Sequence, residues 1–145
     1  MRSKSRKRQH ADLQVALAKT DAQLGQLNWE LAVELTKLAE QTNDPAPLMQ
    51  AVDALRSAVR HYSFEHAPRE HAVIQQGIAD TLLTLGRQTG DRDALESARD
   101  AYRGAITLAS LLSDEALRED LRVNYKLTQT LLGDRPRSAS LFNVA

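Results

Sequence analysis

The sequence predicts an all-α protein, built as an antiparallel array of helical hairpins with two full repeats, a partial third repeat and a long N-terminal helix. Two observations carry this prediction. The 145 residues include 22 Leu and 21 Ala but only six aromatic residues and ten Gly or Pro, a composition that favours helices over a β-sandwich or barrel. In addition, the chain repeats itself after 47 residues: residues 31–63 align with residues 78–110, and 13 of the 33 aligned pairs are identical.

The first predicted element is a long helix over about residues 11–42. It carries an apolar stripe of leucines at sevenfold spacing with two more beside them: Leu17, Leu24, Leu31 and Leu38, with Leu13 and Leu27. Such a stripe can pack on the repeats as a cap or pair with a second chain. We favour the cap, because the ends of a helical array need to be covered.

Each full repeat is predicted to be two helices that bury one apolar side at the helical period. The first helices carry Leu27, Leu31, Leu35 and Leu38, and then Ile74, Ile78, Leu82 and Leu85. The second helices carry Leu48, Ala51, Val52, Leu55, Ala58, Val59 and Tyr62, and then Leu95, Ala98, Tyr102, Ala105, Ile106 and Ala109. Small residues within the stripes would let the helix backbones approach closely: Ala32, Ala39, Ala51, Ala54, Ala79, Gly86, Ala98 and Ala101.

The turn inside each hairpin has a local explanation. Asn43 and Gly90 occupy equivalent positions, and these two residue types best tolerate the left-handed conformation that ends a helix. Asp44 and Asp91 follow, and each has an oxygen suited to accept the free N–H groups of the next helix. Pro45 comes next, at the first helical position. Helices joined this tightly must pack antiparallel.

A partial third copy is predicted to begin near Asp120. Another step of 47 residues carries Leu85-Gly86 onto Leu132-Gly133. The predicted organisation is therefore a basic disordered tail over residues 1–10, a helical repeat domain over 11–133 and a flexible C-terminal tail over 134–145.

The paired helices, the Leu85-Gly86 near the end of a first helix, the Gly90-Asp91 turn and the segment AYRGAI at 101–106 together resemble tetratricopeptide repeats. The likeness is closer to bacterial proteins with lengthened repeats of this type, and it covers about residues 24–133. The resemblance implies a scaffold that binds other proteins, with the first helix of each pair lining a concave groove.

By analogy with that family, the groove should be lined by residues of the first helices that the core stripes do not use: Trp29, Val33 and Lys37, and then Gln76, Asp80, Leu83 and Thr84. A shallow apolar floor with a few polar groups suits a peptide or helix segment of a partner protein. We therefore expect a non-enzymatic adaptor. A purely structural packing role for Trp29 is the alternative.

The charges are unevenly distributed. Nineteen basic residues balance 19 acidic ones, but five of the basic residues and no acid lie in the first nine positions: Arg2, Lys4, Arg6, Lys7 and Arg8. Such a segment can be merely solvated, or it can contact anionic lipid or nucleic acid. Two alternative functions follow, a membrane- or pole-associated assembly factor and a nucleic-acid-associated accessory protein. A homo-oligomer, formed through the long helix or an open end of the array, is also possible.

The sequence offers little for catalysis. It has no Cys, which excludes thiolate metal sites and Cys nucleophiles, and it has no phosphate-binding or nucleophile-elbow motif. His61, His66 and His71 lie five residues apart beside Glu65 and Glu70, unlike the i, i+4 pairs that bind a metal on one helical face. We therefore expect no enzyme activity, cofactor or metal. Without a membrane span or a secretory signal, we expect the chain to act in the cytoplasm.

Overall fold

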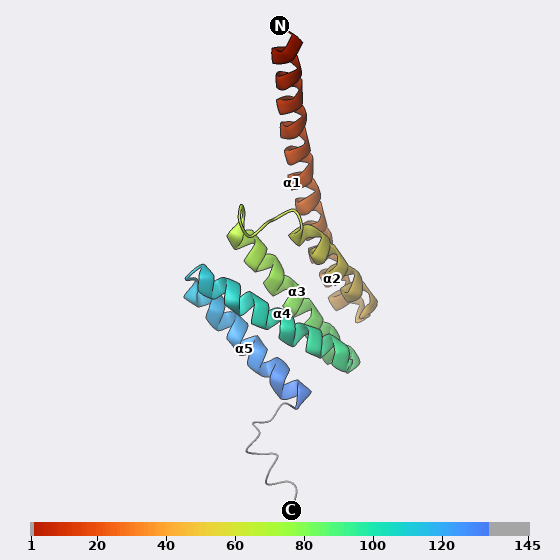
Figure 1. The fold of residues 1–145 in the computed structure, drawn as a ribbon. Coiled ribbons are helices and arrows are strands. Elements are labelled where there is room, and N and C mark those ends of the chain that lie inside the picture. Colours follow the sequence, from red (N-terminus) through yellow and green to blue (C-terminus); the bar gives the residue numbers. More distant parts are fainter. Residues whose placement is uncertain (1, 134–145) are drawn as a thin grey trace, which may run out of the picture.

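The computed structural model describes residues 2–133, and this part of the chain is folded into helices without strands. The helices are α1 (Arg2–Thr42), α2 (Ala46–Val59), α3 (Pro68–Thr89), α4 (Arg92–Leu111) and α5 (Glu115–Leu132). They run up and down in sequence order, so that α1 and α2 form one antiparallel hairpin, α3 and α4 a second, and α5 stands as half of a third (Figure 1). The predicted all-α hairpin array is confirmed.

The N-terminal helix is longer than predicted. It begins at Arg2 rather than near residue 11, and its residues up to Leu24 are exposed and project beyond the other helices (Figure 1). The prediction that residues 1–10 form a disordered tail is therefore wrong for residues 2–10. Arg, Lys and Gln are good helix formers, and the chain has no Gly or Pro before Gly25 to interrupt the helix. The flexible tail predicted over residues 134–145 lies outside the described residues.

The face of α1 that packs on α2 is made of small residues. Gly25, Ala32 and Ala39 are buried, and they recur every seven positions, one residue after leucines of the predicted stripe. These leucines are exposed, as are their neighbours Leu13 and Leu27. The predicted cap is therefore wrong, and so is the assignment of Leu27, Leu31 and Leu38 to the core. A methyl group at Gly25 would lie 2.7 Å from the Cβ of His61, so a larger residue would push α1 away from the turn that follows α2.

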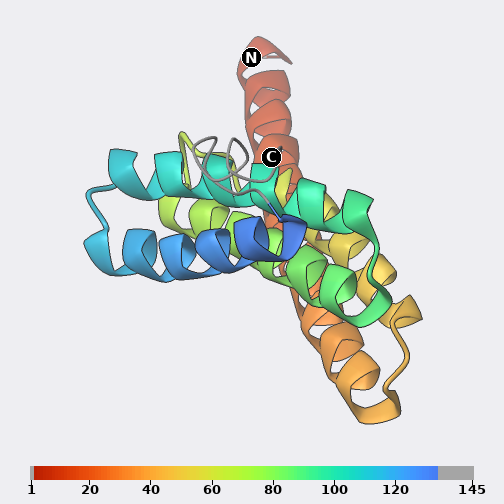
Figure 2. The ribbon, with the colours of Figure 1, turned by 90° about the horizontal axis from the view of Figure 1, so that it is seen from below.

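The stripes predicted for the other helices do form the core. In α2, Leu48 and Leu55 are buried, and in α4 Tyr102 is fully buried. The first-helix stripe of the second copy is buried throughout: Ile74, Ile78, Leu82 and Leu85. Helix α3 lies at the centre because it packs against α2, α4 and α5 (Figure 2). A central helix buries more of its circumference than α1, whose main neighbour is α2.

The turns within the hairpins follow the predicted pattern. Asn43 and Gly90 have left-handed backbones, with φ of 55° and 70°. The carboxylate of Asp44 accepts the N–H of Ala46 at 3.0 Å, and that of Asp91 accepts the N–H of Asp93 at 2.9 Å. Helix α2 begins at Ala46, one residue beyond Pro45. These local bonds satisfy N–H groups that a helix start leaves free.

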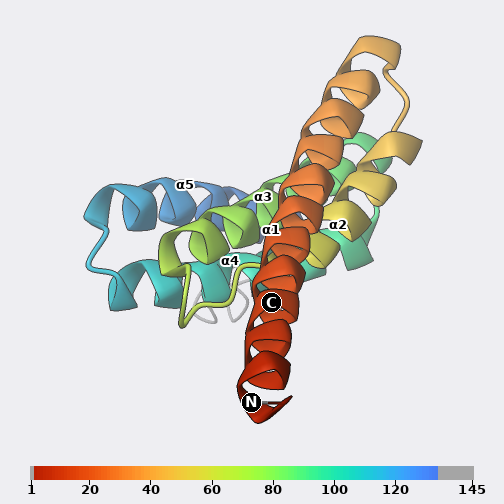
Figure 3. The ribbon, with the colours of Figure 1, turned by 90° about the horizontal axis from the view of Figure 1, so that it is seen from above.

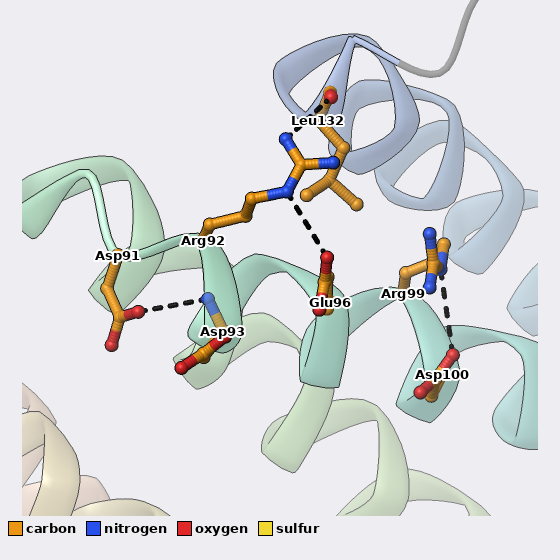
Figure 4. A network of polar contacts seen from close by, with 7 residues as sticks. All are labelled: Asp91, Arg92, Asp93, Glu96, Arg99, Asp100 and Leu132. Carbon is orange, nitrogen blue, oxygen red and sulfur yellow. Dashed lines mark hydrogen bonds and ion pairs between the residues drawn. The ribbon is translucent and has the colours of Figure 1, made fainter.

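The turn between α4 and α5 uses the same arrangement, although the sequence analysis did not identify it. Ser113 has a φ of 54°, and the carboxylate of Asp114 accepts the N–H of Leu117 at 3.0 Å. The signal in the sequence is a small residue followed by Asp, as in the other two turns. At the opposite end of this pair, Arg92 donates to Glu96 and to the carbonyl of Leu132, each at 3.2 Å (Figure 4). This guanidinium fixes the C-terminal end of α5 against the start of α4.

Replacing Gly86 with Ala should destabilise the second hairpin. A Cβ atom at position 86 would lie 2.5 Å from Cδ2 and 2.6 Å from Cγ of Leu95, whose own side chain is buried. We expect the free energy of unfolding, measured by urea titration, to fall by about 1–3 kcal/mol.

Gly104→Ala is the matched control. Gly104 is exposed within α4, and among the described residues no atom lies within 4 Å of an added Cβ there. This change should stabilise the protein by about 0.8–1 kcal/mol, because Ala favours a helix interior over Gly. A Gly86→Ala variant as stable as Gly104→Ala would contradict the close approach of α3 to α4.

Candidate partner-binding groove

A two-part hollow lies along α1. Its wider part, of about 430 Å³, lies near Tyr62 and its narrower part, of about 240 Å³, reaches towards α3. The wider part is lined by Gln26, Trp29, Glu30, Val33, Glu34 and Tyr62. The narrower part is lined by Trp29, Ala32, Val33, Thr36, Lys37, Glu40, Leu55, Gly77 and Thr81. Trp29 and Val33 line both parts, and we call the two adjoining hollows together the α1 groove.

The position of the groove follows from the packing of α1. In Figure 3, α1 lies across the front of α2 and α3, but only α2 packs tightly on α1. The space left between α1 and α3 is floored by Leu55 of α2 and by Gly77, which has no side chain to fill it. Absence of a large side chain at position 77 thus keeps the narrow end of the groove open.

Trp29 forms the apolar floor together with Val33. The indole ring is half-buried and meets the ring of Tyr62 edge to face, with 5.7 Å between ring centroids and 79° between planes. Val33 is 45% exposed. An edge-to-face pair holds the indole in one orientation, so the floor is formed before any partner arrives.

The rim of the groove is acidic. Glu30, Glu34 and Glu40 lie along it with one basic residue, Lys37. The Lys37 ammonium group already binds the Glu34 carboxylate at 2.9 Å, and the Gln26 amide donates to Glu30 at 3.0 Å. Two negative charges therefore remain without a basic counterpart within the groove, and the rim favours a ligand that carries positive charge.

The structure places the predicted groove residues of α1 and α3 differently. Trp29, Val33 and Lys37 of α1 line the α1 groove. The residues of α3 that reach it are Gly77 and Thr81, and no described hollow brings together the four predicted ones: Gln76, Asp80, Leu83 and Thr84. Thr81 could have been noticed as a polar residue next to the core stripe.

Leu83 is the clearest error among these residues. It is only 5% exposed and belongs to the main core. Helix α3 has neighbours on three sides, so its buried face is wider than the stripe counted from the sequence. Gln76 and Thr84 are half-buried, and the Thr84 hydroxyl donates to the Asp80 carbonyl at 2.9 Å.

Asp80 takes part in a polar cluster that joins three helices. Its carboxylate accepts the hydroxyl of Tyr102 from α4 and, at 3.2 Å, the amide of Asn124 from α5. Burial raises the pKa of Asp80, while the two hydrogen bonds act in the opposite direction. Burial likewise raises the pKa of Tyr102, with a further contribution from Asp80. The cluster aligns α3, α4 and α5, and it gives Asp80 a structural role.

The five basic residues predicted to contact an anionic surface all lie on the projecting part of α1: Arg2, Lys4, Arg6, Lys7 and Arg8. Their side chains are exposed. At about 100° of rotation per residue they point in all directions around the helix, so they surround its end and do not form one flat patch. Among the helices within residues 2–133, none combines the length and apolar character needed to cross a bilayer.

His61 and His71 each contact a polar group elsewhere in the chain. His61 binds the carboxylate of Asp21 through Nδ1 at 2.5 Å, and Nδ1 of His71 lies 2.7 Å from the carbonyl oxygen of Tyr62. Phe64 packs its ring edge to face on His71. Within residues 2–133, no three His, Asp or Glu side chains converge to form a metal site.

Comparisons of the chain with models of protein families, with curated proteins and with solved structures found no match. The likeness to tetratricopeptide repeats therefore stays a prediction based on residues 24–133. Any function has to be argued from the groove and the exposed surfaces themselves.

The buried carboxyl of Asp80 should make stability depend on pH. Its pKa is raised in the folded protein from about 3.9 in the unfolded chain. The folded state therefore holds this proton at pH values where the unfolded state has lost it, and the associated stability disappears as the pH rises. In urea titrations between pH 4 and 8, the free energy of unfolding of the wild type should fall relative to Asp80→Asn as the pH increases.

Tyr102→Phe provides the comparison, because it removes a donor and leaves the carboxyl buried. We expect it to lower the free energy of unfolding by about 1–3 kcal/mol at neutral pH. A difference between wild type and Asp80→Asn that does not change with pH would contradict the burial of this group.

Proposed function

We propose that this chain is a non-enzymatic adaptor that holds a segment of a partner protein in the α1 groove. The observation that carries the proposal is the groove itself, two adjoining hollows that share an apolar floor at Trp29 and Val33 and have an acidic rim. Protein-binding grooves commonly combine a few large apolar anchors with polar groups at the edge. The likeness to tetratricopeptide repeats supports the same proposal.

The chemistry of the groove suggests the kind of segment. The two parts together are long enough to follow α1 from Gln26 to Glu40, which at about 1.5 Å per residue is roughly 20 Å. An amphipathic helix, or an extended peptide, could place two or three apolar side chains on this floor. Basic residues beside those anchors would meet Glu30 and Glu40.

The adaptor proposal also accounts for where the ionisable groups lie. The carboxyl of Asp80 is engaged by Tyr102 and Asn124, and His61 is engaged by Asp21. The first group links three helices, and the second links a helix to a turn. Neither Asp80 nor His61 lines the α1 groove.

The two alternative functions depend on the basic residues at the free end of α1. An assembly factor at a membrane or cell pole, or a nucleic-acid-associated protein, would bind phosphate groups through them, with steep salt dependence. These alternatives make no use of the α1 groove. They stay predictions. Binding of the chain to anionic lipid vesicles and to a DNA duplex would test them.

A peptide selection tests the groove. A random-peptide display library is selected against the intact chain, and the recovered peptides are synthesised for titration calorimetry. We expect apolar anchors flanked by Lys or Arg. Val33→Asp should weaken their binding by about tenfold or more, equivalent to about 1.4 kcal/mol, because a carboxylate would stand on the apolar floor.

Leu111→Asp is the matched control. Leu111 is 67% exposed at the end of α4, away from the residues that line the groove, so the same change of side chain there should leave the dissociation constant unaltered. Peptides that bind both variants equally well, or a selection that recovers no binding peptide, would overturn the adaptor proposal.

A further inference from the structure

Helix α1 exposes a second apolar surface that does not belong to the groove. We call it the leucine seam, and it consists of Leu13, Leu17, Leu24, Leu27, Leu31 and Leu38. Each of these side chains is between 46% and 68% exposed. Together with Thr20 and Glu34 they occupy positions separated alternately by four and three residues, which is the a/d pattern of a coiled-coil helix. The pattern extends over more than three heptads.

The leucine seam lies on a face of α1 that the described part of the chain, residues 2–133, leaves exposed. The side towards α2 is occupied by Gly25, Ala32 and Ala39, and the groove lies along Trp29 and Val33. Residues 2–24 are exposed on every side. A helix of this length gains most of its stability in water from tertiary packing, and its seam is the surface shaped for another helix.

The charge distribution along α1 indicates which helix fits. The N-terminal end carries Arg2, Lys4, Arg6, Lys7 and Arg8 without an acid among them. The opposite end carries Glu30, Glu34, Glu40 and Asp44 against a single Lys37. A helix with one basic end and one acidic end is complementary to a second copy of itself running in the opposite direction. In a parallel pair, the five positive charges of each copy would lie side by side.

Glu34 favours the same direction. It is the acidic member of the a/d pattern, and in a parallel pair it would directly face Glu34 of the second copy. In an antiparallel pair with Leu24 against Leu27, each a position faces a d position: Leu13 meets Leu38, Thr20 meets Leu31, and Leu17 meets Glu34. The Glu34 carboxylate is already bound by Lys37, so it faces Leu17 as part of an ion pair.

We propose that two copies of this chain associate through the leucine seam as an antiparallel coiled coil of their α1 helices. In the register given above, Lys7 lies level with Asp44 of the second copy, and Arg8 and Arg6 lie on either side of it. These cations also lie at the C-terminal end of the second α1, where the helix dipole favours positive charge. The dimer thus uses both the projecting half of α1 and its basic residues.

Association is measured first on the intact chain. Sedimentation equilibrium at several protein concentrations should give a dimer mass for the wild type. Leu24→Asp combined with Leu27→Asp places carboxylates at the centre of the seam and should raise the dissociation constant by about a hundredfold or more. Both leucines are exposed, so the variant should keep the helical circular dichroism of the wild type. Val33→Asp, in the groove, should leave the dimer intact and serves as the matched control.

Direction is measured by disulfide cross-linking, which is simple because the chain has no Cys. Leu13→Cys and Leu38→Cys chains, mixed and oxidised, should give a covalent dimer that contains one chain of each kind. Leu13→Cys alone should not cross-link, because the antiparallel pairing separates the two positions by about 25 residues, or roughly 38 Å.

Four results would overturn the proposal. They are a monomer at all concentrations, a dimer unaffected by the two seam substitutions, a dimer lost on Val33→Asp, and self-cross-linking of Leu13→Cys. Two further measurements use vesicles of phosphatidylserine and phosphatidylcholine, and a random-sequence DNA duplex. A monomeric chain that binds either of them through the basic end of α1 would replace the dimer by one of the alternative functions. None of these outcomes depends on whether the groove binds a peptide.

Discussion

The packing of α1 on α2 depends on a strip of α1 that has almost no side chains. Gly25, Ala32 and Ala39 are buried there, and a single methyl group at position 25 would come within 2.7 Å of His61. Because only these small residues of α1 are buried, the contact with α2 covers a narrow part of the circumference of α1. The groove floor with Trp29 lies on one side of that strip and the exposed leucines lie beyond the other, so both surfaces follow from the same contact.

In the second hairpin, α3 and α4 also approach each other closely at a small residue. Leu95 of α4 packs directly on the bare backbone at Gly86, and α3 is then enclosed by α2, α4 and α5. Leu83, which would be exposed on a terminal helix, is buried on this central one. The polar cluster of Asp80, Tyr102 and Asn124 fixes the three helices where apolar contacts alone would allow them to slide, since apolar contacts are not directional. Of the described helices, α2 is the main neighbour of α1, and the α1 groove lies along part of the remaining surface of α1.

Much of this architecture could be predicted from the sequence. The helical period identifies the buried faces of α2, α3 and α4, and the pairs Asn43-Asp44 and Gly90-Asp91 identify two turns, because both signals act locally. Ser113-Asp114 carries the same local signal for a third turn. For the groove, Trp29, Val33 and Lys37 could be predicted as residues outside the leucine stripe, although Trp29 also packs against the core.

The face of α1 could not be predicted in this way. Leucines and small residues recur at the same sevenfold spacing, one position apart, as at Leu31 and Ala32. Hydrophobicity alone favours the leucine as the buried member of each pair. The structure buries the alanine, because the distance between the α1 and α2 backbones decides which residue fits, and that distance is a property of both helices. The continuation of α1 to Arg2 was not predicted either. The charge of residues 2–8 suggests a solvated tail, but their helix propensity is what determines their conformation.

The length of α1 has a geometric consequence for binding. Helix α1 has 41 residues and is therefore about 60 Å long at a rise of about 1.5 Å per residue. In the antiparallel pairing, the Val33 side chains of the two copies lie at levels 15 residues apart, which is roughly 22 Å along the common axis. A ligand carrying two recognition segments at that separation would occupy both copies simultaneously. Once one segment is bound, the fixed spacing holds the second segment at a high effective concentration near the other groove, so the two-segment ligand binds more tightly than either segment alone. A ligand with one segment would bind more weakly for this reason alone.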